Sequence, residues 1–180
     1  HFERHFHEAG RAGSLAADWV FALHRGPGGT LWVGTVGGGV DRWTGNAGRF
    51  ENYSLASLAD GPRGLDDVSA LHETPDGRAW VGTRAGPVVL APRQRAVERV
   101  DLTGVPDNQP LVTTMHADAT GRLWVGSLDH GVFAIDTATR RWELAHPGPP
   151  GAAGNLPKSP ILSLASTEHI LFVGTWGQGV

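Results

Sequence analysis

Cysteine is absent from this 180-residue chain, and tyrosine and methionine occur once each. The lack of cysteine excludes disulfide bonds, iron–sulfur clusters and thiol catalysis. No apolar run approaches the 18 residues that a membrane-spanning helix requires. The formal net charge is only −3, so the chain lacks the basic field that nucleic acid binding demands, and we expect no nucleic acid partner.

Glycine, proline and tryptophan are abundant, with 26, 12 and 7 residues respectively. This composition favours many short strands joined by tight turns, and 40% hydrophobic residues are enough to bury a sizeable core. The chain begins at His1 rather than at methionine and shows no signal-peptide pattern. We therefore expect it to be a segment of a longer protein.

A five-residue motif of the form LWVGT occurs four times, at Leu31–Thr35, Ala79–Thr83, Leu123–Ser127 and Leu171–Thr175. The aromatic residues of the four copies lie 48, 44 and 48 positions apart. They are Trp32, Trp80, Trp124 and Phe172, and each is followed two residues later by a glycine, namely Gly34, Gly82, Gly126 and Gly174. We interpret the repeated aromatic side chains as core residues that pack between neighbouring repeats, where each buries a large apolar area.

Each motif lies within a unit of four predicted strands. The first strand precedes the motif across a polar turn, at Val20–His24, Val68–His72, Val112–His116 and Ile161–Ala165. A third strand follows at Val40–Thr44, Val88–Ala91 and Val132–Asp136, and a fourth at Phe50–Tyr53, Val97–Val100 and Trp142–Leu144. A period of 40–50 residues that carries four antiparallel strands is typical of a β-propeller blade.

We predict an all-β fold, a β-propeller of about four four-stranded blades that forms part of a larger ring. Blades are expected at residues 19–53, 67–101 and 111–144, with a partial blade at 160–180 and the fourth strand of a preceding or split blade at 1–7. In this frame Gly37–Gly39 is a turn between second and third strands. A phosphate-binding loop would instead need a helix directly after the glycines, and no helix pattern follows them.

The repeat resembles that of the two-component regulator propeller family, whose pattern is a strand, then D-x-x-G-x-L-W-V-G-T and a glycine turn. The matching segments are TPDGRAWVGT (Thr74–Thr83), DATGRLWVGS (Asp118–Ser127) and GPGGTLWVGTVGGGVDRW (Gly26–Trp43). Two copies depart from the pattern. The first has Gly26 where the family favours aspartate, and the fourth has the short turn Ser166–His169 and Phe172 in place of tryptophan.

The resemblance implies an extracytoplasmic sensor, the periplasmic or extracellular part of an inner-membrane protein. Propellers of this family precede a membrane span and a histidine kinase or another signalling output, and many of them sense oligosaccharides. The resemblance therefore implies a carbohydrate or other small polar ligand for this chain. Contact with the membrane is expected only through segments outside it.

The ligand is expected on the face where the loops between second and third strands meet the connections between blades. Side chains there combine aromatic rings with charged and amide groups, which suits the stacking and hydrogen bonding of a sugar. The predicted ligand-binding residues are Trp19, Asp67, Arg84, Asp129, His130, Trp176 and Gln178.

Three histidines occupy equivalent positions before the repeated tryptophan, namely His24, His72 and His116. Three imidazoles that converge on the propeller axis could hold zinc. We instead expect a structural role, because the alternation places them on a face that packs against the next blade and neighbouring blades should keep their rings apart. No metal and no cofactor is predicted.

Two other functions remain open at this stage. The first is a protein-interaction scaffold, which includes a homodimer formed through propeller contacts and predicts a large apolar or charged surface patch. The second is a propeller lyase or glycosidase, for which Asp66, Asp67 and Asp129 are the acidic loop residues. A GxSxG nucleophile motif is absent from the sequence, and we expect this segment to be non-catalytic.

Overall fold

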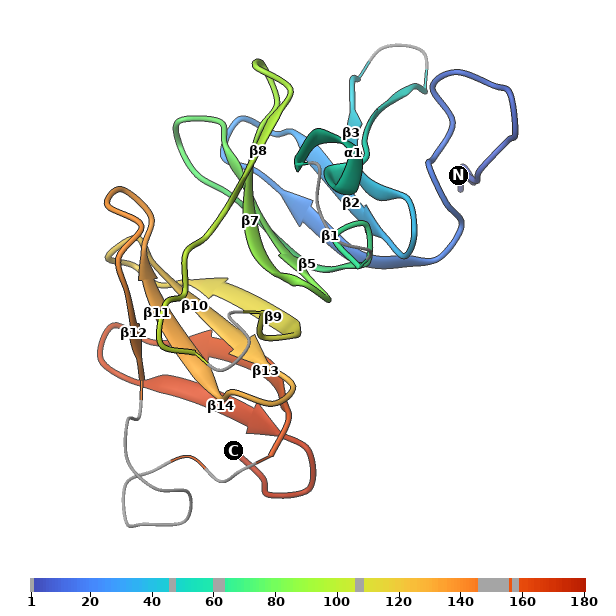
Figure 1. Cartoon of the computed structure of the whole chain (residues 1–180). Coiled ribbons are helices and arrows are strands. Elements are labelled where there is room, and N and C mark those ends of the chain that lie inside the picture. Colours follow the sequence, from blue (N-terminus) through green and yellow to red (C-terminus); the bar gives the residue numbers. More distant parts are fainter. Residues whose placement is uncertain (1, 46–47, 60–63, 106–108, 146–155, 157–158) are drawn as a thin grey trace.

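The computed structural model describes residues 2–45, 48–59, 64–105, 109–145, 156 and 159–180. The described residues form four antiparallel sheets arranged one after another in chain order, with the two ends of the chain at opposite ends of the molecule (Figure 1). This arrangement confirms the predicted all-β propeller fold. None of the helical structure in these residues is both long and apolar enough to span a membrane.

Three sheets contain four strands each, hydrogen-bonded in sequence order. The first comprises β1 (Val20–Arg25), β2 (Leu31–Thr35), β3 (Gly39–Trp43) and β4 (Phe50–Tyr53). The second comprises β5 (Val68–Glu73), β6 (Ala79–Thr83), β7 (Gly86–Ala91) and β8 (Ala96–Arg99). The third comprises β9 (Val112–Ala117), β10 (Arg122–Ser127), β11 (Val132–Asp136) and β12 (Trp142–Leu144), and the last pairs β13 (Ile161–Ser166) with β14 (Leu171–Thr175).

Glycines with a positive φ form part of the turns between strands. Between β5 and β6 the turn Thr74–Gly77 closes with Gly77 at a φ of +80°, a conformation that side-chain-bearing residues rarely adopt. Between β2 and β3 the chain turns at residues 36–38, with Gly37 also at a φ of +80°. The glycine run of the first blade is therefore a turn that leads directly into another strand.

The blades stack through their inner strands, because β1 packs against β5, β5 against β9 and β9 against β13. We call the side of a blade that carries the repeated tryptophan its tryptophan face, and the opposite side its valine face. In the first interface Trp32 joins one buried cluster with Leu71 and Val81, which lie on the valine face of the second blade. In the second interface Trp80 packs in the same way with Val125.

The glycine of each motif lets the next blade approach closely. A Cβ atom added to any of the first three glycines would come within 2.4 to 2.6 Å of a methyl carbon of the following blade. Real Cβ atoms essentially never approach so closely. The contacts are Gly34 with Val68, Gly82 with Val112, and Gly126 with Ile161.

The two end blades each expose one face. Trp32 and Trp80 are 1% exposed, whereas Phe172, at the same position in the last blade, is 44% exposed. On the valine face of the first blade Leu23 is 69% exposed. No other described blade covers these two faces.

The N-terminal segment differs from the prediction, since residues 2–7 form no strand. His5 and Leu15 of this segment instead lie against the valine face of the first blade. The ring of His5 contacts Trp43 and Phe50, with ring centroids 4.9 and 5.4 Å apart. Leu15 is buried with Phe50, and the Phe50 amide donates to the carbonyl oxygen of Gly13 at 2.8 Å. The edge of β4 therefore pairs with an irregular segment rather than with a strand.

A short helix, α1 (Leu55–Ala59), follows the first blade and has no counterpart in the predicted pattern. The Leu55 amide donates to Asp66 Oδ1 at 2.6 Å, and the Ser54 hydroxyl donates to Asp66 Oδ2 at 2.9 Å. A carboxylate from the connection to the next blade thus caps the helix, which is why a local reading of the sequence does not reveal it.

Candidate functional site

One backbone contact recurs in all four blades and brings the predicted loops together. The amide of the residue after the second strand donates to a carbonyl oxygen just before the first strand of the same blade, at 2.9 to 3.1 Å. The donor and acceptor residues are Val36 and Trp19, Arg84 and Asp67, Leu128 and Leu111, and Trp176 and Pro160. The loops between second and third strands therefore share one face with the connections between blades, and we call this face the loop face.

Asp129 and His130 form the closest side-chain pair among the predicted ligand-binding residues. Their Oδ1 and Nδ1 atoms lie 2.6 Å apart. The His130 amide also donates to the Ser127 hydroxyl oxygen at 2.9 Å, which fixes the start of this loop. Asp129 is exposed and His130 is half-buried, so the pair presents a hydrogen-bonding group at the surface of the third blade.

Arg84 and Asp67 meet through the backbone contact of the second blade. The Arg84 side chain is exposed and Asp67 is half-buried. The neighbouring Asp66 has a structural role, because its carboxylate caps α1 and its carbonyl oxygen accepts from the amides of Gly37 and Gly39 at 2.9 and 3.0 Å. Asp66 is therefore a poor candidate for the acidic chemistry that a glycosidase needs.

The aromatic candidates lie at the two ends of the blade array. Trp19 is 72% exposed before β1, and Trp176 is 69% exposed after β14, beside the exposed Gln178. The inner strands of their blades are separated by β5 and β9. The structure therefore places the seven predicted residues on loops of one face but does not gather both tryptophans around a single ligand.

The three repeated histidines lie closer together than the sequence analysis expects. The ring centroids of His24 and His72 are 5.3 Å apart, so the expectation that neighbouring blades separate them is wrong for this pair. The reason is that inner strands pack tightly where the blades converge. Nε2 of His24 accepts from the Glu73 amide at 2.9 Å, and Nε2 of His116 lies 2.8 Å from the Ser166 hydroxyl.

The environment of His24 and His72 favours the neutral forms of these two side chains. Burial, together with the neighbouring charges of His24 and His116, lowers the pKa of His72 to about 4. Burial also lowers the pKa of His24, although the Glu73 carboxylate opposes this effect. Among the described residues no group of three or more histidine, aspartate or glutamate side chains has a geometry that could hold a metal ion.

The repeated tryptophans contribute polar contacts that the sequence analysis missed. Trp32 Nε1 donates to Glu73 Oε2 of the second blade at 2.8 Å, and Glu73 is 8% exposed. A Cβ atom at position 26 would lie 1.7 Å from this carboxylate oxygen, so Gly26 provides the space for it. The sequence signal for this contact was the glycine at position 26, where the family favours aspartate. The acceptor, Glu73, lies 47 residues further along the chain, so the sequence alone did not identify it.

Comparison with known proteins identifies the fold but no family. No family model matches the chain, and no curated protein matches it significantly. A solved structure described as the extracellular domain of a hybrid two-component system from B. thetaiotaomicron matches 88% of the chain with 19% identity and a TM-score of 0.69. The chain spans about a fifth of that domain, since it covers 20% of its length.

Two further structures share the fold with similarly low identity. The YCF48 protein bound to the D1 peptide matches 89% of this chain, at 13% identity and a TM-score of 0.61, and the chain covers 49% of it. The computationally designed Ika4 protein matches 100% of this chain, at 16% identity and a TM-score of 0.62, with 96% of Ika4 covered. These likenesses support a propeller architecture.

Proposed function

We propose that this chain is part of an extracytoplasmic ligand-sensing propeller of a two-component receptor, located in the periplasm or at the cell surface. Two findings support the proposal. The repeat resembles that of two-component regulator propellers, and the fold is similar to the extracellular domain from B. thetaiotaomicron. A histidine kinase domain would lie outside the chain. Ligand binding would shift the populations of different blade or subunit arrangements, and the activity of the downstream domain would depend on these populations.

The loop face is the proposed binding surface, and the ligand class is an oligosaccharide or another small polar molecule. The observation that carries this proposal is the backbone contact that recurs in all four blades and holds the loops on one face. The surface offers the Arg84 guanidinium, the Asp129–His130 pair and the exposed rings of Trp19 and Trp176. Planar donors pair with sugar hydroxyls and indole rings stack on sugar faces.

A screen of soluble oligosaccharides by isothermal titration calorimetry tests this proposal. We expect at least one saturable binder, and we expect Arg84→Ala to weaken it about tenfold through loss of charged hydrogen bonds. Arg93→Ala is the matched control, because Arg93 is exposed in the turn between β7 and β8, away from the loop face. The absence of any binder, or equal losses in both variants, would contradict the proposal.

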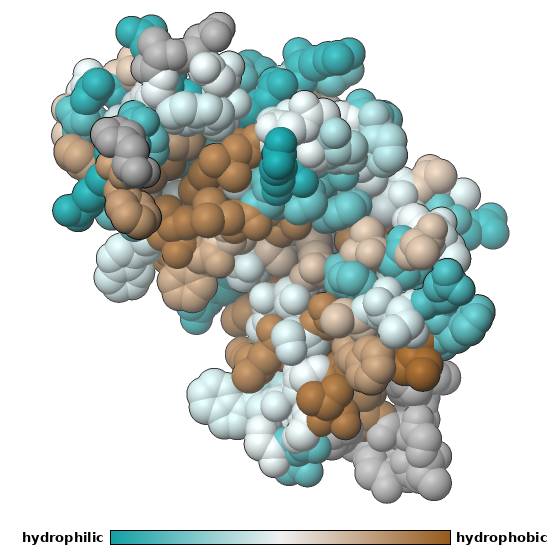
Figure 2. All heavy atoms as spheres, turned by 180° about the vertical axis from the view of Figure 1, so that it is seen from behind, coloured by the Kyte–Doolittle hydropathy of each residue, from teal (hydrophilic) through white to brown (hydrophobic). Residues whose placement is uncertain are grey.

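A second candidate function is a protein-interaction scaffold, including a homodimer formed through propeller contacts. Large apolar side chains are exposed on both end blades, among them Phe21 (71%) and Leu23 (69%) on β1 and Leu162 (49%) on β13. Figure 2 shows hydrophobic residues at the surface over the part of the molecule that holds the first two sheets and again over the part that holds the last two. Multi-angle light scattering distinguishes a dimer from a 19.1 kDa monomer, and Leu23→Glu should dissociate a dimer formed through this face.

A further inference from the structure

The indole N–H groups of equivalent tryptophans donate to different partners in the first and third blades. Trp32 donates to the Glu73 carboxylate of the next blade, as described above. Trp124 donates to Asp118 Oδ2 of its own blade, also at 2.8 Å. In both cases the buried or half-buried indole N–H is satisfied by a carboxylate oxygen, and two sequence positions supply it. We call them the turn position (Gly26, Asp118) and the cross-blade position (Glu73).

Trp80 has a carboxylate at neither position. Its turn position is occupied by Thr74, since the Thr74 amide bonds to the Arg78 carbonyl just as the Asp118 amide bonds to that of Arg122. Its cross-blade position is occupied by Ala117, which pairs with Leu123 as Glu73 pairs with Ala79. Within the part of the chain that the structure describes, Trp80 Nε1 forms no hydrogen bond. The side chain as a whole is only 1% exposed, but this nitrogen keeps some contact with solvent. This N–H group can therefore donate to an acceptor that enters from solvent.

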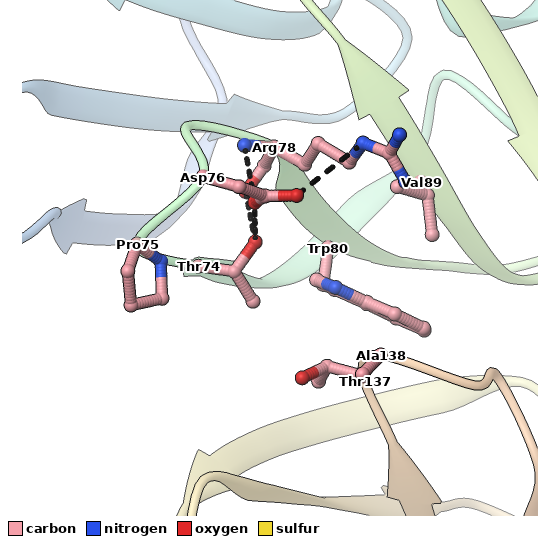
Figure 3. A pocket seen from close by; sticks show the side chains of 8 residues that line it. All are labelled: Thr74, Pro75, Asp76, Arg78, Trp80, Val89, Thr137 and Ala138. Carbon is pink, nitrogen blue, oxygen red and sulfur yellow. Dashed lines mark hydrogen bonds and ion pairs between the residues drawn. The ribbon is translucent and has the colours of Figure 1, made fainter.

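A pocket opens beside the Trp80 ring. Its volume is about 280 Å³, and Figure 3 shows the indole between the Thr74–Arg78 turn of its own blade and Thr137 and Ala138 of the third blade. The pocket is formed by a turn between first and second strands and by one between third and fourth strands. Because strands in a blade alternate in direction, these turns lie at the opposite end of the blades from the loop face.

The charged groups at the pocket are Asp76 and Arg78. Asp76 Oδ1 accepts from the Thr74 hydroxyl at 2.6 Å and from the Arg78 amide at 3.2 Å, and these bonds lower the pKa of Asp76. Its Oδ2 lies 3.5 Å from Arg78 Nε. The Asp76 oxygens are thus engaged within the turn, as the dashed lines in Figure 3 indicate, whereas a guanidinium has further N–H donors beyond Nε.

We propose that this pocket binds a carboxylate group of a ligand, with Trp80 Nε1 as the donor and Arg78 as the neutralising charge. The bound carboxylate takes the place that Glu73 and Asp118 occupy beside the equivalent indoles. Pro75 and Val89 provide an apolar wall for the rest of the ligand. The carboxylate can belong to a sugar acid or to an acidic amino acid side chain. This site is separate from the loop face and does not depend on the function proposed above.

The indole N–H signals of the 180-residue chain provide a direct test by ¹H–¹⁵N NMR. The sequence has seven tryptophans, and Trp80→Phe assigns the Trp80 signal by its disappearance while it keeps an aromatic ring in the core. We expect titration with glucuronate or with N-acetylglutamate α-amide to shift this signal saturably, because a carboxylate then accepts from the indole. The tighter of the two acids identifies the source of the group. Glucose, which lacks a carboxylate, should leave the signal in place.

Thr74→Asn is the matched blocking variant. Its amide oxygen can accept from Trp80 Nε1 as Asp118 does in the third blade, while its NH₂ group replaces the Thr74 hydroxyl donation to Asp76. We expect it to weaken binding of the acid at least tenfold, whereas Glu168→Ala, at an exposed position in the last blade, should leave the affinity unchanged. The proposal is overturned if neither acid shifts the Trp80 signal, if glucose shifts it equally, or if Thr74→Asn binds as the parent does.

Discussion

The Glu73 carboxylate and the backbone amide of the same residue join the first two blades through two separate bonds. One satisfies the buried N–H of Trp32, and the other reaches the ring of His24. The family-like motif at Trp32 predicted the packing of its indole ring. It did not predict the acceptor, because residue 73 meets residue 32 only after the blades have stacked.

Loss of the Glu73 carboxylate should therefore destabilise the protein. Glu73→Ala leaves the Trp32 N–H buried without its acceptor, and we expect the free energy of unfolding to fall by about 1–3 kcal/mol. Urea-induced unfolding measures this change. Glu168→Ala, at an exposed position in the last blade, should change it by no more than about 0.5 kcal/mol. Equal effects of the two substitutions would contradict the structural role of Glu73.

The lowered pKa of His72 predicts a pH dependence of stability. The folded pKa of about 4 lies below the ordinary value of 6.5, so between these values the unfolded chain binds more protons. Stability is fully present above pH 6.5 and declines as the pH falls towards 4. Because the ring is only partly buried, the contribution of His72 should be about 1–2 kcal/mol.

Urea-induced unfolding at pH 7.5 and pH 5 measures this dependence. In His72→Gln, which cannot titrate, we expect a smaller loss of stability between the two pH values than in the parent chain. The comparison removes the contributions of other groups, including His24, because they are present in both proteins. An unchanged pH dependence in the variant would show that His72 is not held neutral by its surroundings.

At the scale of the strand, the repeat predicted much of the fold. The bounds of six strands coincide with the predicted runs, because β-branched and aromatic residues between glycine turns have few alternatives to a strand. These strands are β2, β4, β6, β11, β12 and β14. The prediction of a strand at residues 2–7 was wrong. The sequence there is similar to that at Phe50, but a strand also needs a neighbouring strand with which to form hydrogen bonds. Helix α1 depends on Asp66, which lies outside it.

The motif glycines offer a test of the packing between blades. Gly82→Ala places a methyl group 2.4 Å from a Val112 methyl carbon in the buried second interface, so the blades must separate. We expect a loss of about 1–3 kcal/mol in the free energy of unfolding. Gly174→Ala is the control, because its new methyl meets only the Ser163 hydroxyl, which can rotate away. Similar losses in both variants would contradict the stacking of β5 on β9.

For the molecule as a whole, the sequence predicted which loops share a face but not how their side chains meet. Alternating strand direction is enough to place Arg84, Asp129 and Trp176 on the loop face. The distance between Asp129 and His130 depends on the conformation of one loop, and the separation of Trp19 from Trp176 depends on how the blades curve. The sequence analysis also did not predict the pocket beside Trp80, because its lining combines the Thr74–Arg78 turn with Thr137 and Ala138 of the next blade.

Hydrogen exchange followed by mass spectrometry, with and without the oligosaccharide that binds best in the screen, tests the central claim most directly. We expect the ligand to slow exchange in the loops after β6 and β10, which contain Arg84 and the Asp129–His130 pair. Exchange in the Thr74–Gly77 turn on the opposite face should stay unchanged. Protection confined to that turn, or no protection anywhere in the chain, would contradict a sensor that binds its ligand on the loop face.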